Sequence, residues 1–120
     1  SVVEGKLKPE TKTGDVFNAL FPGGSITGAP KIKVMQEIQN LEEAPRGVYT
    51  GAIGYMSNNG KSQFNIPIRT ITIENEDLEF STGGGIVFES QCDQEYQECL
   101  VKAQGILEAL GLEKNEIKSA

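Results

Sequence analysis

The fold of this chain is constrained most strongly by two runs of alternating apolar residues that an Asn-Gly pair separates. The first run covers residues 48–56 and the second covers residues 63–73, with the pair at Asn59 and Gly60. Such a pair between two alternating runs is the strongest short-range signal for a β-hairpin, because both residues tolerate the positive φ angles of a type I′ turn. The sequence therefore predicts antiparallel pairing near the centre of the chain.

Further strands are predicted on both sides of this hairpin. Residues 1–7 alternate and are rich in strand-forming side chains, and a turn at residues 74–77 leads into a strand that begins at residue 78. This strand runs into a glycine triplet at residues 83–85 before apolar residues resume. A glycine triplet inside a strand indicates a bulge or a close approach of the backbone to another group.

Three helices are predicted as well. A short helix covers residues 15–20, and a longer one begins near residue 29, where apolar residues recur at helical spacing as far as Leu41. This longer helix is expected to pack on the sheet. The last helix covers residues 93–110 and is followed by Gly111, which suits a C-cap. Its predicted core face consists of Tyr96, Leu100, Ala103, Leu107 and Leu110.

These elements together predict an α+β fold, with a largely antiparallel sheet and two long helices packed on one face. We expect residues 1–110 to belong to one domain and residues 111–120 to form a polar tail.

The composition excludes several classes of function. With 120 residues, of which 38% are hydrophobic and 23% charged, the chain has the make-up of one modest soluble domain. No apolar run approaches the length of a membrane span, and no secretory leader is visible. The net charge is −6 and the basic residues form no stripe, which argues against binding to nucleic acid.

The cysteine and histidine content limits the kinds of catalytic and metal sites that the chain can form. Cys92 and Cys99 would lie about 10 Å apart along one helix, too far for a disulfide. They are predicted to be free thiols in a reducing compartment, which indicates the cytoplasm. Histidine is absent, so the chain can build neither a zinc site nor a Ser-His-Asp triad from its own residues.

The segment FPGGSITGAPK at residues 21–31 is a glycine-rich loop that leads into a helix. Its backbone N–H groups, the hydroxyls of Ser25 and Thr27 and the positive end of the helix suit a carboxylate or a phosphate. It is not a Walker phosphate loop, because Gly28 is followed by Ala29. An ordinary structural loop before a helix that starts with proline fits the segment equally well.

Glu95 and Glu98 project from the same side of the last predicted helix, with Lys102 one turn further along. Two carboxylates on one rigid element could supply part of a magnesium site, with the other ligands coming from elsewhere. The alternative is a solvated helix face with an ion pair between Glu98 and Lys102.

Two further side chains could contact a ligand. Arg69 is predicted to lie in the middle of a strand, where its guanidinium must meet either a bound anion or a structural partner such as Glu98. Tyr49 could pack in the core or offer its hydroxyl to a ligand.

Five segments in order resemble the signatures of the chorismate-utilising enzymes, which include anthranilate, aminodeoxychorismate, isochorismate and salicylate synthases. These segments are FPGGSITGAPK, YTGAIGYM, NIPIRT, STGGGIV and EYQECLVKA. The resemblance runs from Ser1 to about Leu110. The amino-acid sequence of the first segment and the GGG triplet are most similar to component I of aminodeoxychorismate (para-aminobenzoate) synthase, with anthranilate synthase component I as the alternative.

The resemblance implies a role for each candidate residue. Glu95 and Glu98 match carboxylates of the family's magnesium site. The positions expected to contact the substrate chorismate are Ser25, Tyr49, Arg69, Gly83, Gly85 and Lys102. Chorismate is a dianion, and a site made of cationic side chains, amide N–H groups and a divalent ion would neutralise it.

The resemblance also implies that this chain is the C-terminal half of the chorismate-binding fold. The catalytic residues and the remaining magnesium ligands are then expected upstream, so none is expected here, and the 120 residues alone are expected to be inactive. The implied reaction aminates chorismate to 4-amino-4-deoxychorismate in folate synthesis, with ammonia from a glutamine amidotransferase subunit.

Two hypotheses of other classes stay open. The chain could be a module that binds a carboxylate metabolite without chemistry. It could also associate with a second copy of itself through exposed strand edges and apolar faces.

Overall fold

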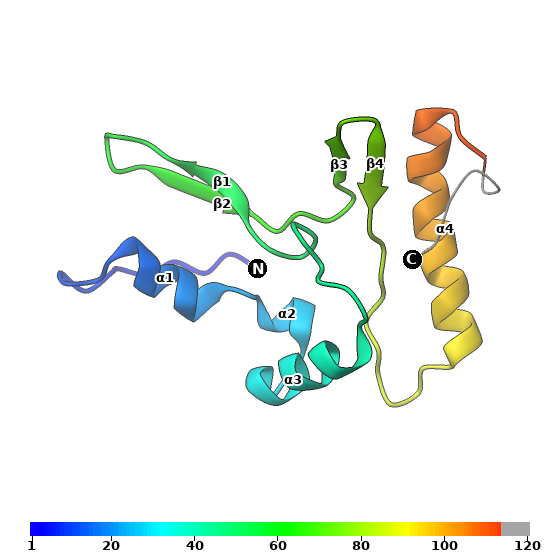
Figure 1. Cartoon of the computed structure of the whole chain (residues 1–120). Helices are drawn as coiled ribbons and strands as arrows, with labels where there is room; N and C mark the ends of the chain where they lie inside the picture. Colours follow the sequence, from blue (N-terminus) through cyan, green and yellow to red (C-terminus); the bar gives the residue numbers. More distant parts are fainter. Residues whose placement is uncertain (114–120) are drawn as a thin grey trace. The chain divides into compact units, whose positions relative to one another are not determined.

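The structure is a computed structural model, shown in Figure 1, that describes residues 1–113. Its contacts divide the chain into two compact units, Ser1–Pro45 and Arg46–Ala120. We describe each unit by itself. Among residues 1–113, no helix is long and apolar enough to cross a membrane.

The first unit holds three helices: α1 at Thr13–Leu20, α2 at Gly24–Thr27 and α3 at Lys31–Leu41. Helix α1 begins with a local cap, in which the Asp15 carboxylate accepts a hydrogen bond from the Lys12 backbone N–H at 2.8 Å. At its other end, the rings of Phe17 and Phe21 stack with their centroids 5.3 Å apart. The predicted helix at residues 15–20 is thereby confirmed, whereas the strand predicted at residues 1–7 is wrong, because that segment has no regular structure.

The glycine-rich loop of the first unit contains one helical turn that the sequence did not predict. Helix α2 ends at Gly28, whose φ of 109° lies in a region that side chains disfavour and whose N–H donates to the Gly24 carbonyl at 2.8 Å. Helix α3 follows directly after Pro30, as predicted, and packs on α2. Ile32 and Leu41 are 68% and 79% exposed, so packing of the α3 stripe on a sheet stays a prediction.

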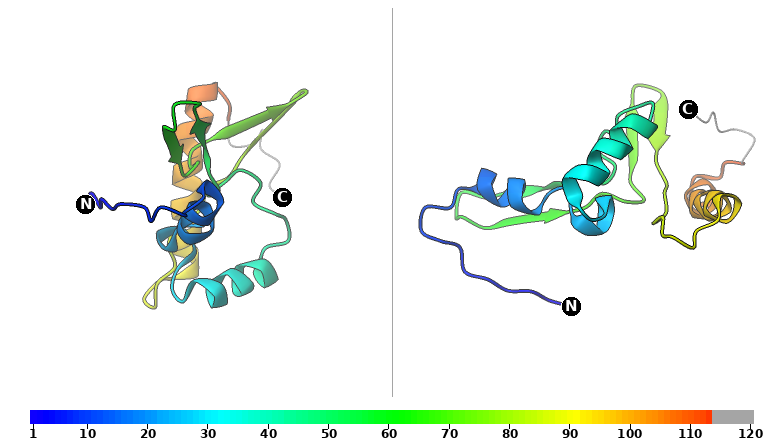
Figure 2. Two further views of the ribbon diagram at one scale, coloured as in Figure 1. Left: turned by 90° about the vertical axis from the view of Figure 1, so that its left-hand side faces the viewer. Right: turned by 90° about the horizontal axis from the view of Figure 1, so that it is seen from below.

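The second unit contains two antiparallel hairpins. Strands β1 (Ile53–Met56) and β2 (Ser62–Asn65) pair across the predicted Asn-Gly turn, where Gly60 adopts a φ of 82°. Strands β3 (Ile71–Glu74) and β4 (Asp77–Phe80) pair across the second predicted turn. The two hairpins form separate two-stranded sheets and point in different directions in Figure 1 and Figure 2.

The long strand predicted at residues 63–73 is wrong, because the chain leaves the sheet between β2 and β3. Pro67 has no N–H to donate to a ladder and is, among residues 1–113, the largest fully buried side chain. Its carbonyl instead accepts a hydrogen bond from Thr50 at 2.9 Å. Arg69 then adopts a φ of 51°, so the prediction of a mid-strand position for Arg69 is also wrong.

The strand predicted at residues 48–56 is shorter than expected, because its first half is a turn. Tyr49 N–H donates to the Arg46 carbonyl at 3.0 Å, and Thr50 has a φ of 62°. Gly54 lies opposite Phe64 in the β1–β2 pair, where a Cβ would fall 2.7 Å from the Phe64 Cα. Glycine at this position therefore allows the close strand pairing.

Helix α4 spans Cys92–Leu110 and confirms the last predicted helix. It ends at Gly111, which has a φ of 69°, and the next N–H, from Leu112, donates to the Leu107 carbonyl at 2.9 Å. These bonds form a Schellman motif, so the predicted glycine cap is confirmed. Of the predicted core face, Leu107 is buried but Tyr96 is 62% exposed, which corrects the assignment of Tyr96 to the core. The predicted polar tail lies mostly in residues 114–120, outside the described residues.

Taken together, the helices and antiparallel hairpins confirm the α+β class. Few apolar side chains are buried within the described residues: the buried hydrophobic positions are Ile106 and Leu107, both on α4.

Candidate functional site

The residues predicted on one face of α4 lie together in the second unit. The Lys102 ammonium Nζ lies 2.5 Å from Glu98 Oε1, which is the ion pair that the spacing of four residues allows. The same ammonium donates a second hydrogen bond to the backbone carbonyl of Gly83, at 3.0 Å. Lys102 therefore connects the helix with the segment that carries the glycine triplet.

This environment raises the pKa of Lys102 above that of an ordinary lysine. The largest cause is the hydrogen bond from the ammonium to Glu98, followed by partial desolvation, which opposes it, and by the charge of Glu98. Cys99 and Tyr49 add electrostatic contributions in the raising direction. The ammonium is consequently held in its charged form among these groups.

The glycine triplet approaches this cluster closely. A Cβ on Gly83 would lie 2.9 Å from the Tyr49 hydroxyl oxygen, and one on Gly84 would lie 3.1 Å from Glu95 Oε2. A Cβ on Gly85 would meet nothing within 4 Å. The predicted close backbone approach is confirmed at the first two glycines. The triplet lies in an extended loop after β4 and not inside a strand, which corrects that part of the prediction.

Two hydroxyl groups attach this loop and the following turn to α4. Thr82 Oγ1 donates to the Cys99 backbone carbonyl at 3.2 Å. Ser90 Oγ donates to Glu95 Oε1. Sequence reasoning missed both residues, although a serine just before a predicted helix is a recognisable signal for local hydrogen bonding.

The structure brings five of the predicted site residues into this cluster: Tyr49, Gly83, Glu95, Glu98 and Lys102. Gly85 follows in the same loop, with open space beside it. Arg69 is exposed in the segment between β2 and β3, without a hydrogen bond or ion pair inside residues 1–113. Ser25 is exposed in α2 of the first unit.

Glu95 and Glu98 are the residues that would hold part of a magnesium site. From the position of a Cβ on Gly84, Glu95 Oε2 lies at 3.1 Å, and Glu98 Oε1, the atom that also pairs with Lys102, lies at 3.6 Å. Magnesium often binds through one or two carboxylates and completes its octahedron with water and substrate oxygens. Residues 1–113 contain no group of three or more His, Cys, Asp or Glu side chains that could hold a metal ion. The described chain therefore offers two carboxylate ligands for such an ion.

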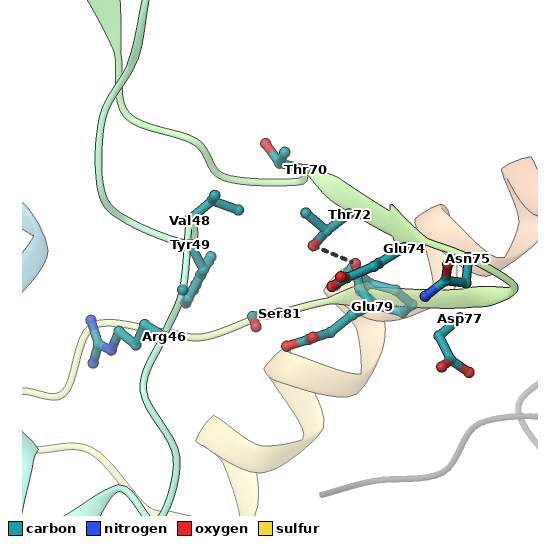
Figure 3. Close-up of a pocket in the computed structure, with 12 residues that line it drawn as sticks. Arg46, Val48, Tyr49, Thr70, Thr72, Glu74, Asn75, Asp77, Glu79 and Ser81 are labelled. Carbon is teal, nitrogen blue, oxygen red and sulfur yellow. Dashed lines mark hydrogen bonds between the residues drawn. The ribbon is translucent and has the colours of Figure 1, made fainter.

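A cavity of about 400 Å³, which shares Tyr49 with the cluster on α4, lies beside the β3–β4 hairpin and is shown in Figure 3. Glu74, Asp77 and Glu79 line it, together with Arg46 and Tyr49. Thr72 Oγ1 donates to the Glu79 carbonyl at 3.3 Å within its wall. Three carboxylates against one guanidinium make this cavity unfavourable for a dianion, so the cluster on α4 is the better candidate site.

Both cysteines lie on α4 as free thiols, as predicted, with Cys92 exposed and Cys99 half-buried.

The known proteins that this chain matches are consistent with one another in the family that they indicate. The sequence profile of chorismate binding enzymes matches residues 1–108. Over 107 residues the chain is 44% identical to anthranilate synthase component 1 of Lactococcus lactis. This alignment covers 89% of this chain and 24% of that protein. Over 118 residues it is 42% identical to aminodeoxychorismate synthase component 1 of Bacillus subtilis, covering 98% of this chain and 25% of that protein. The chain thus spans about a quarter of the length of these relatives.

A solved structure from Bacillus anthracis, described as an isochorismate synthase specific for 2,3-dihydroxybenzoate, superposes with a TM-score of 0.77 and 31% identity. The match covers 88% of this chain and 28% of that one. Sequence and fold agree, and the chain belongs to the family of chorismate binding enzymes.

Proposed function

We propose that this chain supplies the C-terminal part of an aminodeoxychorismate synthase component 1, an enzyme that aminates chorismate to 4-amino-4-deoxychorismate for folate synthesis. The observation that carries the proposal is the cluster of Glu95, Glu98 and Lys102 against Gly83 and Gly84. It combines a fixed cation, two carboxylates and an exposed loop backbone within one small region. These are the groups that a dianionic substrate with a bound divalent ion requires.

In this proposal each residue binds or orients one part of the substrate. Lys102, held by Glu98 and the Gly83 carbonyl, faces a carboxylate of chorismate. The open space beside Gly85 lets a second carboxylate reach the loop backbone, and Tyr49 contributes its hydroxyl beside Gly83 in the same loop. Arg69 and Ser25 are exposed and are assigned to the same substrate from segments that lie elsewhere in the chain.

Glu95 and Glu98 are proposed to hold magnesium together with ligands from outside this chain. When bound, the ion supplies Lewis acidity that helps the C4 hydroxyl of chorismate to leave. The ammonia is proposed to come from a glutamine amidotransferase subunit. The free thiols Cys92 and Cys99 agree with a cytoplasmic location for the enzyme.

We also propose that the complete enzyme contains further residues, because this chain matches only part of the length of its relatives. The chain spans 24% to 25% of the length of the two component 1 relatives compared above. Large apolar side chains are also exposed, including Ile32, Ile73 and Phe88 at 68%, 71% and 99%. Exposed apolar surface of this kind is typical of an interface that another segment covers. We therefore expect the isolated 120 residues to lack activity.

Anthranilate synthase is the second candidate, because the relative from Lactococcus lactis carries that name at 44% identity. The two candidates share the same substrate and differ in the product.

The experiment that tests the proposal supplies the complete protein with chorismate, magnesium and an ammonium salt, and identifies the product by chromatography and mass. Formation of 4-amino-4-deoxychorismate is expected. Formation of anthranilate would favour the second candidate, and tight chorismate binding with no turnover would favour a binding module. Turnover by the isolated 120 residues would contradict the proposed need for further segments.

A further inference from the structure

Ser90 occupies a short turn between the glycine triplet and α4. Its backbone N–H donates to the Val87 carbonyl at 3.1 Å, and its Oγ accepts a hydrogen bond from the Val87 N–H at 3.0 Å. The turn is therefore closed by two bonds. The serine oxygen accepts from a backbone N–H through one lone pair, and its hydroxyl hydrogen is donated to Glu95 Oε1.

This bond gives the two Glu95 carboxylate oxygens different surroundings. Oε1 accepts the hydrogen bond from the Ser90 hydroxyl, whereas Oε2 lies 3.1 Å from the position of a Cβ on Gly84, and Glu98 Oε1 lies 3.6 Å from that same position. The half-buried Glu95 thus turns one oxygen toward Ser90 and the other toward Gly84, the glycine that Glu98 Oε1 also approaches. The orientation of that carboxylate depends on a residue five positions earlier in the chain.

We propose that Ser90 is a positioning residue that makes Glu95 a one-oxygen ligand and thereby favours Mg²⁺ over Ca²⁺ at this site. This inference rests on the proposed function. Calcium commonly takes both oxygens of a carboxylate and accepts irregular coordination, whereas magnesium demands a compact octahedron with single oxygens. A hydroxyl that holds Oε1 away from the ion disfavours the calcium arrangement. Partners of this kind, one step removed from the ion, commonly determine how a ligand is oriented.

The test measures binding of the metal alone to the complete protein by calorimetry, with Mg²⁺ and Ca²⁺ as separate titrants. Ser90→Ala is expected to weaken Mg²⁺ binding by about tenfold, at the low end of the range for such partners. It is expected to weaken Ca²⁺ binding less, so that the ratio of the two affinities falls. Ser90→Thr keeps the hydroxyl and is expected to preserve the ratio. Ser62→Ala, on an exposed position of β2, is the matched serine control.

Two results would overturn the inference in distinguishable ways. If Ser90→Ala binds both ions as the parent protein does while Glu98→Gln loses Mg²⁺, Ser90 has no positioning role and the proposed metal site stands. If Glu95→Gln and Glu98→Gln also leave Mg²⁺ binding unchanged, the metal site of the proposed function is wrong as well. Circular dichroism establishes that each variant is folded. Should Ser90→Ala unfold, Ser90→Cys, which keeps the size but donates weakly, is measured in its place.

Discussion

The Lys102 ammonium donates to the Gly83 backbone carbonyl across 19 positions of sequence, at 3.0 Å, while it pairs with Glu98 on its own helix. One side chain thereby fixes both the helix face and the glycine loop of the candidate site.

The Glu98→Gln substitution is expected to lower the pKa of Lys102, because Glu98 is the main cause of its rise. Because the pKa of Lys102 is higher in the folded protein than in the unfolded chain, the Lys102–Glu98 pair contributes its full stabilisation of the fold at pH values below the ordinary lysine pKa. This stabilisation is lost as the pH rises through the raised value. The chemical shift of the Lys102 Cε, followed by NMR through an alkaline titration, measures the change.

The control for this titration is a second pair of the same spacing. Lys33 and Glu37 on α3 lie 2.6 Å apart, and Glu37→Gln should leave the Lys102 titration unchanged. Because the Lys102 and Glu98 side chains are 37% and 52% exposed, 1 M salt should reduce the shift in the parent protein. A Lys102 titration that does not respond to Glu98→Gln would contradict the assignment.

The Gly83→Ala substitution is expected to destabilise the loop, because its Cβ would lie 2.9 Å from the Tyr49 hydroxyl. Overpacking of this kind commonly costs about 1 to 3 kcal/mol. Removing the hydroxyl with Tyr49→Phe should recover part of the loss, so the double mutant should be more stable than the two single losses predict. Urea unfolding of all four proteins in the cycle measures the coupling. Strict additivity would show that the contact does not exist.

The Gly84→Ala substitution is expected to weaken binding of a divalent ion with little loss of stability. Its Cβ would press on Glu95 Oε2 at 3.1 Å and lie 3.6 Å from Glu98 Oε1, and flexible carboxylates can move by a few tenths of an ångström. Titration with Mn²⁺ followed by electron paramagnetic resonance measures the affinity. Gly85→Ala meets nothing within 4 Å and is the neighbouring control for metal affinity. Equal effects of the two substitutions would argue against a direct contact with the carboxylates.

The Gly105→Ala substitution is expected to raise the stability of α4. The position is exposed inside the helix, and a Cβ there meets nothing within 4 Å. Alanine is favoured over glycine in a helix interior by about 1 kcal/mol. Thermal unfolding of the complete protein should show a higher midpoint. A lower midpoint would instead reveal a further segment packed against this face of the helix.

Much of the fold could be predicted because its signals are local. The Asn-Gly pair at Asn59 and Gly60 fixes one hairpin through turn geometry, and Gly111 ends α4 where a left-handed residue is required. The predicted strand through Pro67 is wrong because an alternating apolar pattern carries no information about hydrogen bonding, and proline has no N–H to donate to a ladder. The turn of α2 was missed because glycine has a low helix propensity, which tertiary contacts override.

The candidate site was predictable to a similar extent. The spacing of Glu95, Glu98 and Lys102 determines that they share a helix face, so their ion pair followed from sequence. The contact of Tyr49 with Gly83 joins segments 34 positions apart, and no local rule predicts it. The role of Ser90 was missed for a different reason, since it depends on the direction of one hydroxyl group.

The bonds that attach the glycine loop to α4 have an evolutionary consequence. Thr82 donates to the Cys99 carbonyl and Lys102 donates to the Gly83 carbonyl, so both acceptors are main-chain atoms. Every residue type carries such an oxygen, so substitution at position 99 preserves its attachment, whereas position 83 stays restricted to glycine by the Tyr49 hydroxyl, 2.9 Å from where a Cβ would lie. A family built on this scaffold can therefore vary the side chain at position 99 while the main-chain oxygen there continues to hold the loop.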